Sequence, residues 1–264
     1  NLTGNVKKPI VLNSSVTLKT LAYTFGNDVA GGAVKFDGTG GVDVTLPDST
    51  VLSVNGALTY TSSTSYSLAI TVGAAATSFA VNGGEALSLG TATGSFVRNA
   101  TGTTLNVAMS SSVAWKPVSG LTVSNVAATA ALTCNTGATC VPTFNVTGTL
   151  GFDLGIPGLN TAVVSGSLDN SGFKFNATFS DLIFSTTGDI KLIAPTLALT
   201  IPAKTSTDKS SATLSGNFSM FGATLAGSMT FSSAGVLLLG TVPAFKFTNS
   251  DIGFDGGQFA WLLK

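Results

Sequence analysis

Phe173-Lys174-Phe175-Asn176-Ala177-Thr178-Phe179 is the stretch of sequence that decides the fold class of this chain. Its apolar and polar residues alternate without interruption. Successive side chains of a β-strand point to opposite faces, so the pattern predicts a strand with one buried and one solvated face. The same alternation recurs at 197–201 and 214–220. Short polar clusters that end in glycine, as hairpin turns with a positive φ require, separate these runs at 169–172, 185–188 and 232–235.

Two segments read as copies of one hairpin unit. Ser-Gly-Ser-Leu at 165–168, followed by the strand that begins at Gly172, aligns with Ala-Gly-Ser-Met at 226–229, followed by the strand that begins at Gly235. The spacing between such copies along the chain is irregular, so a strict repeat period is not expected. The pattern predicts a weakly repetitive antiparallel meander.

The N-terminal segment also reads as a strand, with a change of phase in its middle. Val16 and Leu18 share one phase, whereas Leu21, Tyr23 and Phe25 share the other. One extra residue in a strand shifts the phase in this way, so we expect a β-bulge near Lys19-Thr20.

Composition agrees with these patterns. Strand-forming Val, Thr and Phe alternate with turn-forming Gly and Ser, and long runs of helix-forming residues are missing. We predict an all-β protein, an antiparallel meander of glycine-turn hairpins forming one elongated or two packed β-sandwich or barrel-like domains. The division places an N-terminal β domain at 1–132 and a C-terminal β domain with repeated hairpins at 133–264; a single continuous β domain is the alternative.

Charge and histidine content exclude several classes of function. Twelve basic and twelve acidic residues cancel, and charged residues make up only 9% of the chain, so nothing in the sequence attracts nucleic acid. No apolar run reaches the ~20 residues of a membrane helix. The chain has no histidine, which excludes Ser-His-Asp and Cys-His nucleophiles and histidine-containing zinc sites. We therefore predict a protein that is not an enzyme and has no cofactor.

The two cysteines point to a compartment. Cys134 and Cys140 flank the glycine-containing loop Asn-Thr-Gly-Ala-Thr, which would let them meet as a disulfide at a hairpin tip. Structural disulfides persist in oxidising environments, so we expect an extracellular or cell-surface location. No leader-like segment opens the sequence, and we expect Asn1 to be the first residue of a processed chain.

Six Asn-X-Ser/Thr sequons are candidates for N-glycosylation. Three of them fall on the polar phase of predicted strands, where an attached glycan would project into solvent. The six asparagines are Asn1, Asn13, Asn99, Asn145, Asn176 and Asn217.

A weak calcium possibility involves Asp37 and Asp43, in a glycine-rich segment that resembles a calcium-binding turn. The nonapeptide repeat that makes such sites specific occurs at best once, so an ordinary hairpin is the favoured interpretation and we predict no metal site.

Two functions are favoured. The first is a non-catalytic extracellular structural or adhesive protein, a self-associating subunit of a fibre, pilus-like filament or surface layer. Its sheet edges carry few of the charges and prolines that usually prevent edge pairing, and an N-terminal strand donated to a neighbouring subunit is one possible mechanism. The candidate residues for strand donation are Val11, Val16, Leu18, Leu21, Tyr23 and Phe25.

The alternative is a secreted β-sheet binding module. An apolar ligand such as a lipid would occupy an interior lined by phenylalanines, whereas a glycan would stack on exposed aromatic rings. A close-packed core predicts the same phenylalanines. The interior candidates are Phe173, Phe175, Phe179, Phe184, Phe218 and Phe221, and the surface candidates are Tyr23, Trp115 and Trp261.

Overall fold

The computed structural model describes residues 2–6, 8–27, 34–62, 65–72, 77–79, 85–136, 138, 140–153, 161–184, 187–188, 190–203, 205–220, 223–242, 244–246, 253–254 and 256–263. All regular elements in these ranges are β-strands. They are β1 (Leu2–Val6), β2 (Ile10–Asn13), β3 (Val16–Asn27), β4 (Val34–Thr45), β5 (Val51–Ser62), β6 (Ser65–Val72), β7 (Thr77–Phe79), β8 (Leu87–Leu89), β9 (Thr91–Arg98), β10 (Gly102–Ser110), β11 (Trp115–Val118), β12 (Leu121–Asn135), β13 (Thr143–Phe152), β14 (Ala162–Asp169), β15 (Gly172–Thr178), β16 (Leu182–Ile183), β17 (Ile190–Pro202), β18 (Ser211–Met220), β19 (Ala223–Ser232), β20 (Gly235–Val242), β21 (Phe245–Lys246), β22 (Gly253–Phe254) and β23 (Gly257–Leu263).

One 19-stranded sheet contains almost all of these strands. Its pairings follow the chain: β1 and β2 lie end to end beside β3, and the sheet continues through β4, β5, β6, β9, β10, β12, β13, β14, β15, β17, β18, β19 and β20 to β23. Every pairing is antiparallel. The predicted antiparallel all-β meander is therefore confirmed, and no helix in the described ranges has the length and apolarity to cross a membrane.

The alternation that predicted the strands also sets their burial. Phe173 and Phe175 are 3% and 1% exposed, whereas Lys174 and Asn176, which alternate with them, face solvent. The glycines that end the three predicted turns, Gly172, Gly188 and Gly235, all have positive φ, which residues with a Cβ rarely adopt.

Three long strands share one arrangement. β3, β12 and β17 each pair on one side with two short strands placed end to end: β1 and β2, β10 and β11, and β15 and β16. On its other side, each long strand has a register shift near the junction of its two short partners. The shift in β3 falls between Leu18 and Thr20, which confirms the predicted bulge. Bulges increase local twist, so these three positions bend the sheet.

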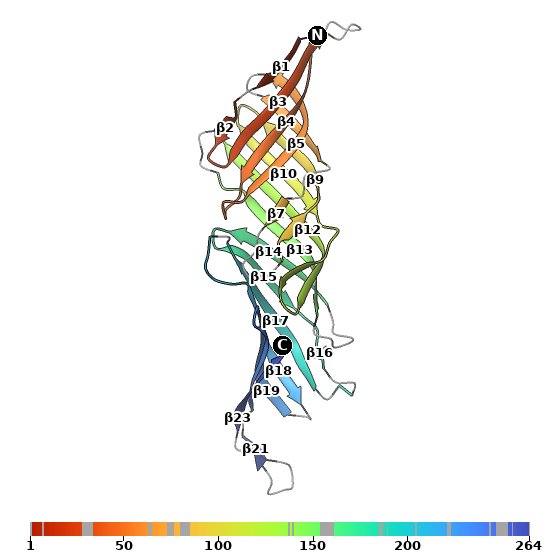
Figure 1. Cartoon of the computed structure of the whole chain (residues 1–264), viewed down its shortest axis with the longest axis vertical. Helices are drawn as coiled ribbons and strands as arrows, with labels where there is room; N and C mark the ends of the chain where they lie inside the picture. The colour runs from red at the N-terminus through yellow and green to blue at the C-terminus, as the bar shows by residue number, and fades with distance from the viewer. Residues whose placement is uncertain are drawn as a thin grey trace.

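The sheet curls until its apolar face closes on itself. Trp115 in β11 and Phe175 in β15 have ring centroids 6.0 Å apart, and Phe152 in β13 lies 5.9 Å from Phe231 in β19. These strands are not neighbours in the sheet, so their contact requires the sheet to fold over. The small β7–β8 sheet adds Phe79 to the core. The result is an elongated molecule, with β1–β5 at one end and β18–β23 toward the other (Figure 1).

Glycines on the inner face make room for aromatic rings. A Cβ placed on Gly166 would lie 2.7 Å from Cε1 of Phe175, and one on Gly227 would lie 2.6 Å from Cε2 of Phe218. Both distances are far below ordinary carbon contacts of ~3.5–4 Å. The Gly-Ser pair shared by the two repeat copies is thus explained, because in each copy the glycine lies against a phenylalanine ring.

Pairing is continuous across the boundary expected between 132 and 133. β12 contains that boundary. It pairs with β10 across it, from Ala127 to Asn135, and with β13 at 121–124 and 127–131. One core cluster of buried side chains also includes residues from both sides, from Val16 to Val236. The described strands thus form one sheet system across that position.

Candidate functional site

The two ends of the sheet are free edges. Among the described residues, β2 pairs only with β3, and β23 pairs only with β20. An edge strand presents unpaired backbone N–H and C=O groups, which can pair with a strand of another chain. The free edges lie on opposite halves of the elongated molecule (Figure 1).

Neither edge strand carries a charge. β2 reads Ile-Val-Leu-Asn and β23 reads Gly-Gln-Phe-Ala-Trp-Leu-Leu. In β2, Ile10 is 44% exposed and Val11 is 72% exposed. Lys8 and Pro9 precede β2 and separate it from β1. Lysine and proline oppose the pairing of an edge strand with another chain, but here they lie outside β2, so β2 itself contains no such residue.

The two edge strands have opposite senses along the ladder of the sheet. Every pairing from β2 to β23 reverses the strand direction, and following the reversals along the sheet leaves β23 antiparallel to β2. A β2 strand of a second copy that paired with β23 in the antiparallel sense would therefore continue the alternation of the sheet.

The segment expected to be donated to a neighbour does not lie at an edge. Val16 and Leu18 are 1% and 4% exposed in β3, and β3 pairs on both sides, with β1 or β2 and with β4. Leu21, Tyr23 and Phe25 belong to the same strand. Donation of β3 would require its pairing with β4 and its pairing with β1 and β2 to break together. The sequence pattern did not reveal that β1 and β2 pair with this side of β3. Only Val11 lies in an edge strand.

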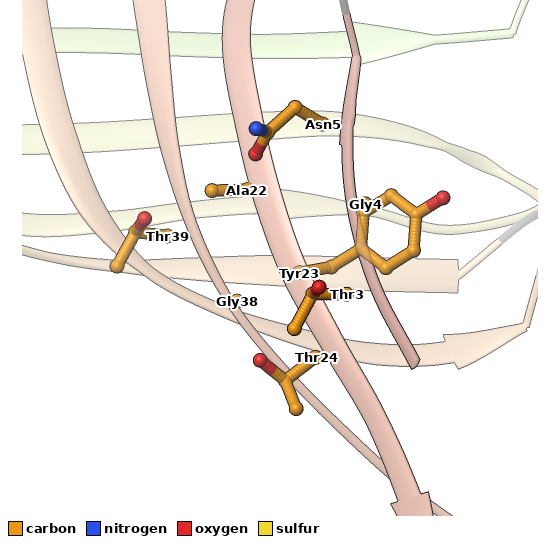
Figure 2. Close-up of a pocket in the computed structure, with 8 residues that line it drawn as sticks. All are labelled: Thr3, Gly4, Asn5, Ala22, Tyr23, Thr24, Gly38 and Thr39. Carbon is orange, nitrogen blue, oxygen red and sulfur yellow. The ribbon is translucent and has the colours of Figure 1, made fainter. Parts of the chain in front are cut away.

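The outer face of the sheet carries shallow, uncharged concavities. One of about 450 Å³ is lined by residues of β1, β3 and β4. Figure 2 shows Ala22 in its middle, with Asn5 and Thr39 on either side and Tyr23 turned away from them toward Gly4. A second, of about 560 Å³, lies over β14, β15, β17 and β18 and is lined by Val163, Asn176, Ala177, Thr178, Thr196, Leu197, Ala198, Thr213 and Ser215.

The two cysteines form a disulfide, as predicted, with their Cα atoms 5.6 Å apart. They close the loop between β12 and β13. The hydroxyl of Ser15, in the turn between β2 and β3, donates a hydrogen bond to the carbonyl oxygen of Cys140 at 3.0 Å. The disulfide loop therefore lies against the N-terminal hairpin.

The sequon asparagines lie on several strands and turns. Asn145, Asn176 and Asn217 are exposed on the outer face of β13, β15 and β18. Asn99 lies in the exposed β9–β10 turn, where its side-chain oxygen accepts a hydrogen bond from the hydroxyl of Thr101 at 2.7 Å. Asn13 ends β2, and Asn1 lies outside the described residues.

The structure does not form the calcium turn considered for Asp37 and Asp43. The glycine-rich segment is part of strand β4, and Asp37 and Asp43 are six positions apart in it. At ~3.3 Å per residue they are separated by roughly 20 Å, too far to share one ion. Asp43 instead pairs with Lys19 at 3.0 Å. Pairing with β3 and β5 over the whole segment holds it extended, and no cluster of metal-ligand residues occurs in the described ranges.

The aromatic residues considered for ligand binding serve mainly as core. Trp115 is 2% exposed and its indole nitrogen donates to the carbonyl oxygen of Glu85 at 2.8 Å. Phe179 and Phe218 are buried, and Phe184 packs against the core. Trp261 belongs to β23, and Phe221 lies outside the described residues. The phenylalanine-lined interior is thus filled by its own side chains.

Two aspartates have lowered pKa values. A hydrogen bond from the Ser171 hydroxyl, with Lys174 as a further partner, lowers the pKa of Asp169 to about 2. A hydrogen bond from Lys191 lowers the pKa of Asp181, which also accepts from the backbone N–H of Ala194 at the β17 bulge. Both carboxylates bind structural partners. Asp169 stabilises the turn between β14 and β15, and Asp181 stabilises the bulge of β17.

Comparisons with known proteins give no relative. No protein-family model matches the chain, no curated protein matches it in sequence, and no solved structure matches it in fold.

Proposed function

We propose that this protein is a non-catalytic extracellular structural or adhesive subunit that assembles head to tail through its two free sheet edges. The observation that carries the proposal is the pair of uncharged edge strands at the two ends of one continuous antiparallel meander. A contact between two different surfaces of the same molecule generates an open chain of subunits unless it closes into a ring.

The N-terminal partner in this contact is β2 rather than β1. β2 exposes Ile10 and Val11, whereas β1 exposes Thr3 and Asn5. Pairing with a second strand would cover the apolar side chains and satisfy the unpaired backbone groups of both strands. The disulfide and the scarcity of charge support an extracellular setting for such an assembly.

A charge placed on the edge tests this mechanism. Val11→Lys adds a cation to β2 at a position that is 72% exposed, so the fold should tolerate it within roughly 0.5 kcal/mol. Val163→Lys is the control, because Val163 is 77% exposed but lies in β14, an interior strand of the sheet that pairs with β13 at Val163 itself and with β15 from Ser165 onward.

The readout is negative-stain electron microscopy over a range of protein concentrations, without reductant or detergent. We expect filaments for the wild type and for Val163→Lys, and separate particles for Val11→Lys. Separate wild-type particles at every concentration would overturn the proposal, and so would filaments of Val11→Lys.

A further inference from the structure

The outer face of the sheet carries continuous rows of small, uncharged residues, in which alanine is interspersed with asparagine, serine and threonine. Neighbouring strands align Asn5, Ala22, Thr39, Ala57, Ala69, Ser95, Asn106, Ala131 and Thr143 as successive cross-strand partners. We call these nine residues the N-terminal row. Asn, Thr, Ser and Ala are its only residue types, and none of its members is buried.

A second row has the same composition. It contains Ala127, Thr147, Ser165, Asn176, Ala198, Thr213 and Thr230, and we call it the C-terminal row. No member is charged and none is buried.

One three-residue pattern occurs three times in these rows. Asn, Ala and Thr are direct cross-strand partners on a short strand, the long bulged strand and the following strand. The three occurrences are Asn5–Ala22–Thr39, Asn106–Ala131–Thr143 and Asn176–Ala198–Thr213. Their central residues lie on β3, β12 and β17, the three strands that share the split-partner arrangement, so the pattern recurs in the same structural context.

The pattern creates hydrogen-bonding concavities. Alanine in the centre leaves a depression between the longer asparagine and threonine side chains, and two of the three occurrences line the concavities of about 450 Å³ and 560 Å³. Figure 2 shows the first of them, with the side chains of Asn5, Ala22 and Thr39 on the same face. A carboxamide offers both donors and an acceptor, and a hydroxyl offers one donor and two acceptor lone pairs.

These polar groups are available to a ligand. The side chains of Asn5, Asn106 and Asn176 make no hydrogen bond within the described part of the chain. Lys174, the charged residue closest in sequence to Asn176, pairs with Asp169 at 2.9 Å. Rows that offer many hydrogen-bonding groups and contain no charged residue complement a neutral, polyhydroxylated ligand and provide an anion or cation with no counter-charge of their own.

We infer that the rows bind a neutral polysaccharide. Cross-strand partners are spaced by ~4.8 Å, so the nine residues of the N-terminal row span roughly 40 Å along the curved sheet. A repeated site on an extended surface suits a linear polymer with a repeated unit, because each engaged site raises the effective concentration at the next. This binding does not require head-to-tail assembly, since both rows lie within one copy.

The test is native gel electrophoresis of the full chain through gels that contain a polysaccharide. The neutral probes are dextran, mannan, galactomannan and mixed-linkage β-glucan; the anionic probes are polygalacturonate and heparin. We expect retardation by at least one neutral probe and none by the anionic probes. The Val11→Lys protein should be retarded equally, which separates this inference from the assembly proposal.

Substitutions then locate the surface. Asn106→Ala and Asn176→Ala should each weaken binding about two- to tenfold, as expected for the loss of one neutral hydrogen-bonding group, and the triple change with Asn5→Ala should weaken it a hundredfold or more. Asn217→Ala is the matched control, because Asn217 is an exposed asparagine of β18 outside both rows. Circular dichroism verifies that the variants are folded.

The inference is overturned if no neutral probe retards the protein. It is equally overturned if the triple variant binds like the wild type, if Asn217→Ala weakens binding as much as the row variants, or if the anionic probes bind as tightly as the neutral ones.

Discussion

Gly166→Ala tests whether the interior of the curled sheet is as tightly packed as the structure indicates. The new Cβ would lie 2.6 Å from the carbonyl oxygen of Lys174 and 2.7 Å from Cε1 of Phe175. Carbon atoms in ordinary contact are ~3.5–4 Å apart, so the Phe175 ring must retreat by about 1 Å. Phe175 is 1% exposed and packs against Trp115, which leaves the ring little space to move.

We expect Gly166→Ala to lose a moderate amount of stability, whereas the control variant should lose none. Overpacking of this kind costs about 1–3 kcal/mol, partly offset by the ~0.4–1 kcal/mol that a glycine-to-alanine change gains by restricting the unfolded chain. We therefore expect the free energy of unfolding to fall by about 1–2 kcal/mol. In Gly151→Ala the nearest atom, Cγ2 of Thr161, would be at 3.5 Å, so that variant should be unchanged or more stable.

Urea denaturation followed by tryptophan fluorescence measures both variants, because Trp115 lies beside Phe175. Equal stability of Gly166→Ala and Gly151→Ala would refute the packing described for the inner face. It would also make the interior of the curled sheet a candidate binding site for an apolar ligand again.

Three further changes test other features of the structure. Trp115→Phe removes the hydrogen bond to the Glu85 carbonyl oxygen, and thermal unfolding should show a loss of about 1–2 kcal/mol; no loss would mean that the carbonyl finds another partner. Reduction of the 134–140 disulfide should lower the free energy of unfolding by about 2 kcal/mol, from the entropy of so short a loop, and an unchanged urea midpoint would contradict this. The Asp169 pKa is lowered from 3.8 to about 2, chiefly by the Ser171 hydroxyl, so the ionised carboxylate stabilises the fold above about pH 4 and this contribution disappears as pH falls through 2. Because the side chain is 47% exposed, we expect only about 0.5 kcal/mol, and Asp169→Asn should flatten the stability profile between pH 4 and pH 2 relative to the wild type.

Much of the local structure could be predicted from the sequence, because alternation and turn chemistry act over a few residues. The run 173–179 showed which side chains are buried, and the phase change near Lys19 located a bulge. Glycine at 172 and 235 marked turns that require a positive φ. In each case, the physical cause lies within the segment itself.

Features that depend on distant partners could not be predicted. The segment 36–43 looks like a glycine-rich turn, yet pairing with β3 and β5 makes it a strand. The bulges of β12 and β17 contain Asn125 and Ala194 with positive φ. Alanine carries no turn signal, and asparagine, which tolerates positive φ, has no glycine or proline beside it at 125 to mark a turn. The Asn–Ala–Thr pattern joins residues up to 37 positions apart in the order of the chain (Asn176 to Thr213), and only the strand register brings them together.

The head-to-tail contact is tested most directly by mixing two edge variants, Val11→Lys and Ala260→Lys. Ala260 is an exposed residue of β23, so each variant keeps one intact edge and loses the other. Analytical ultracentrifugation should find each variant monomeric alone and a one-to-one mixture forming dimers and nothing larger, because the intact β23 of one variant can pair with the intact β2 of the other. Dimers of either variant alone, or a mixture that remains monomeric, would contradict head-to-tail pairing of β2 with β23.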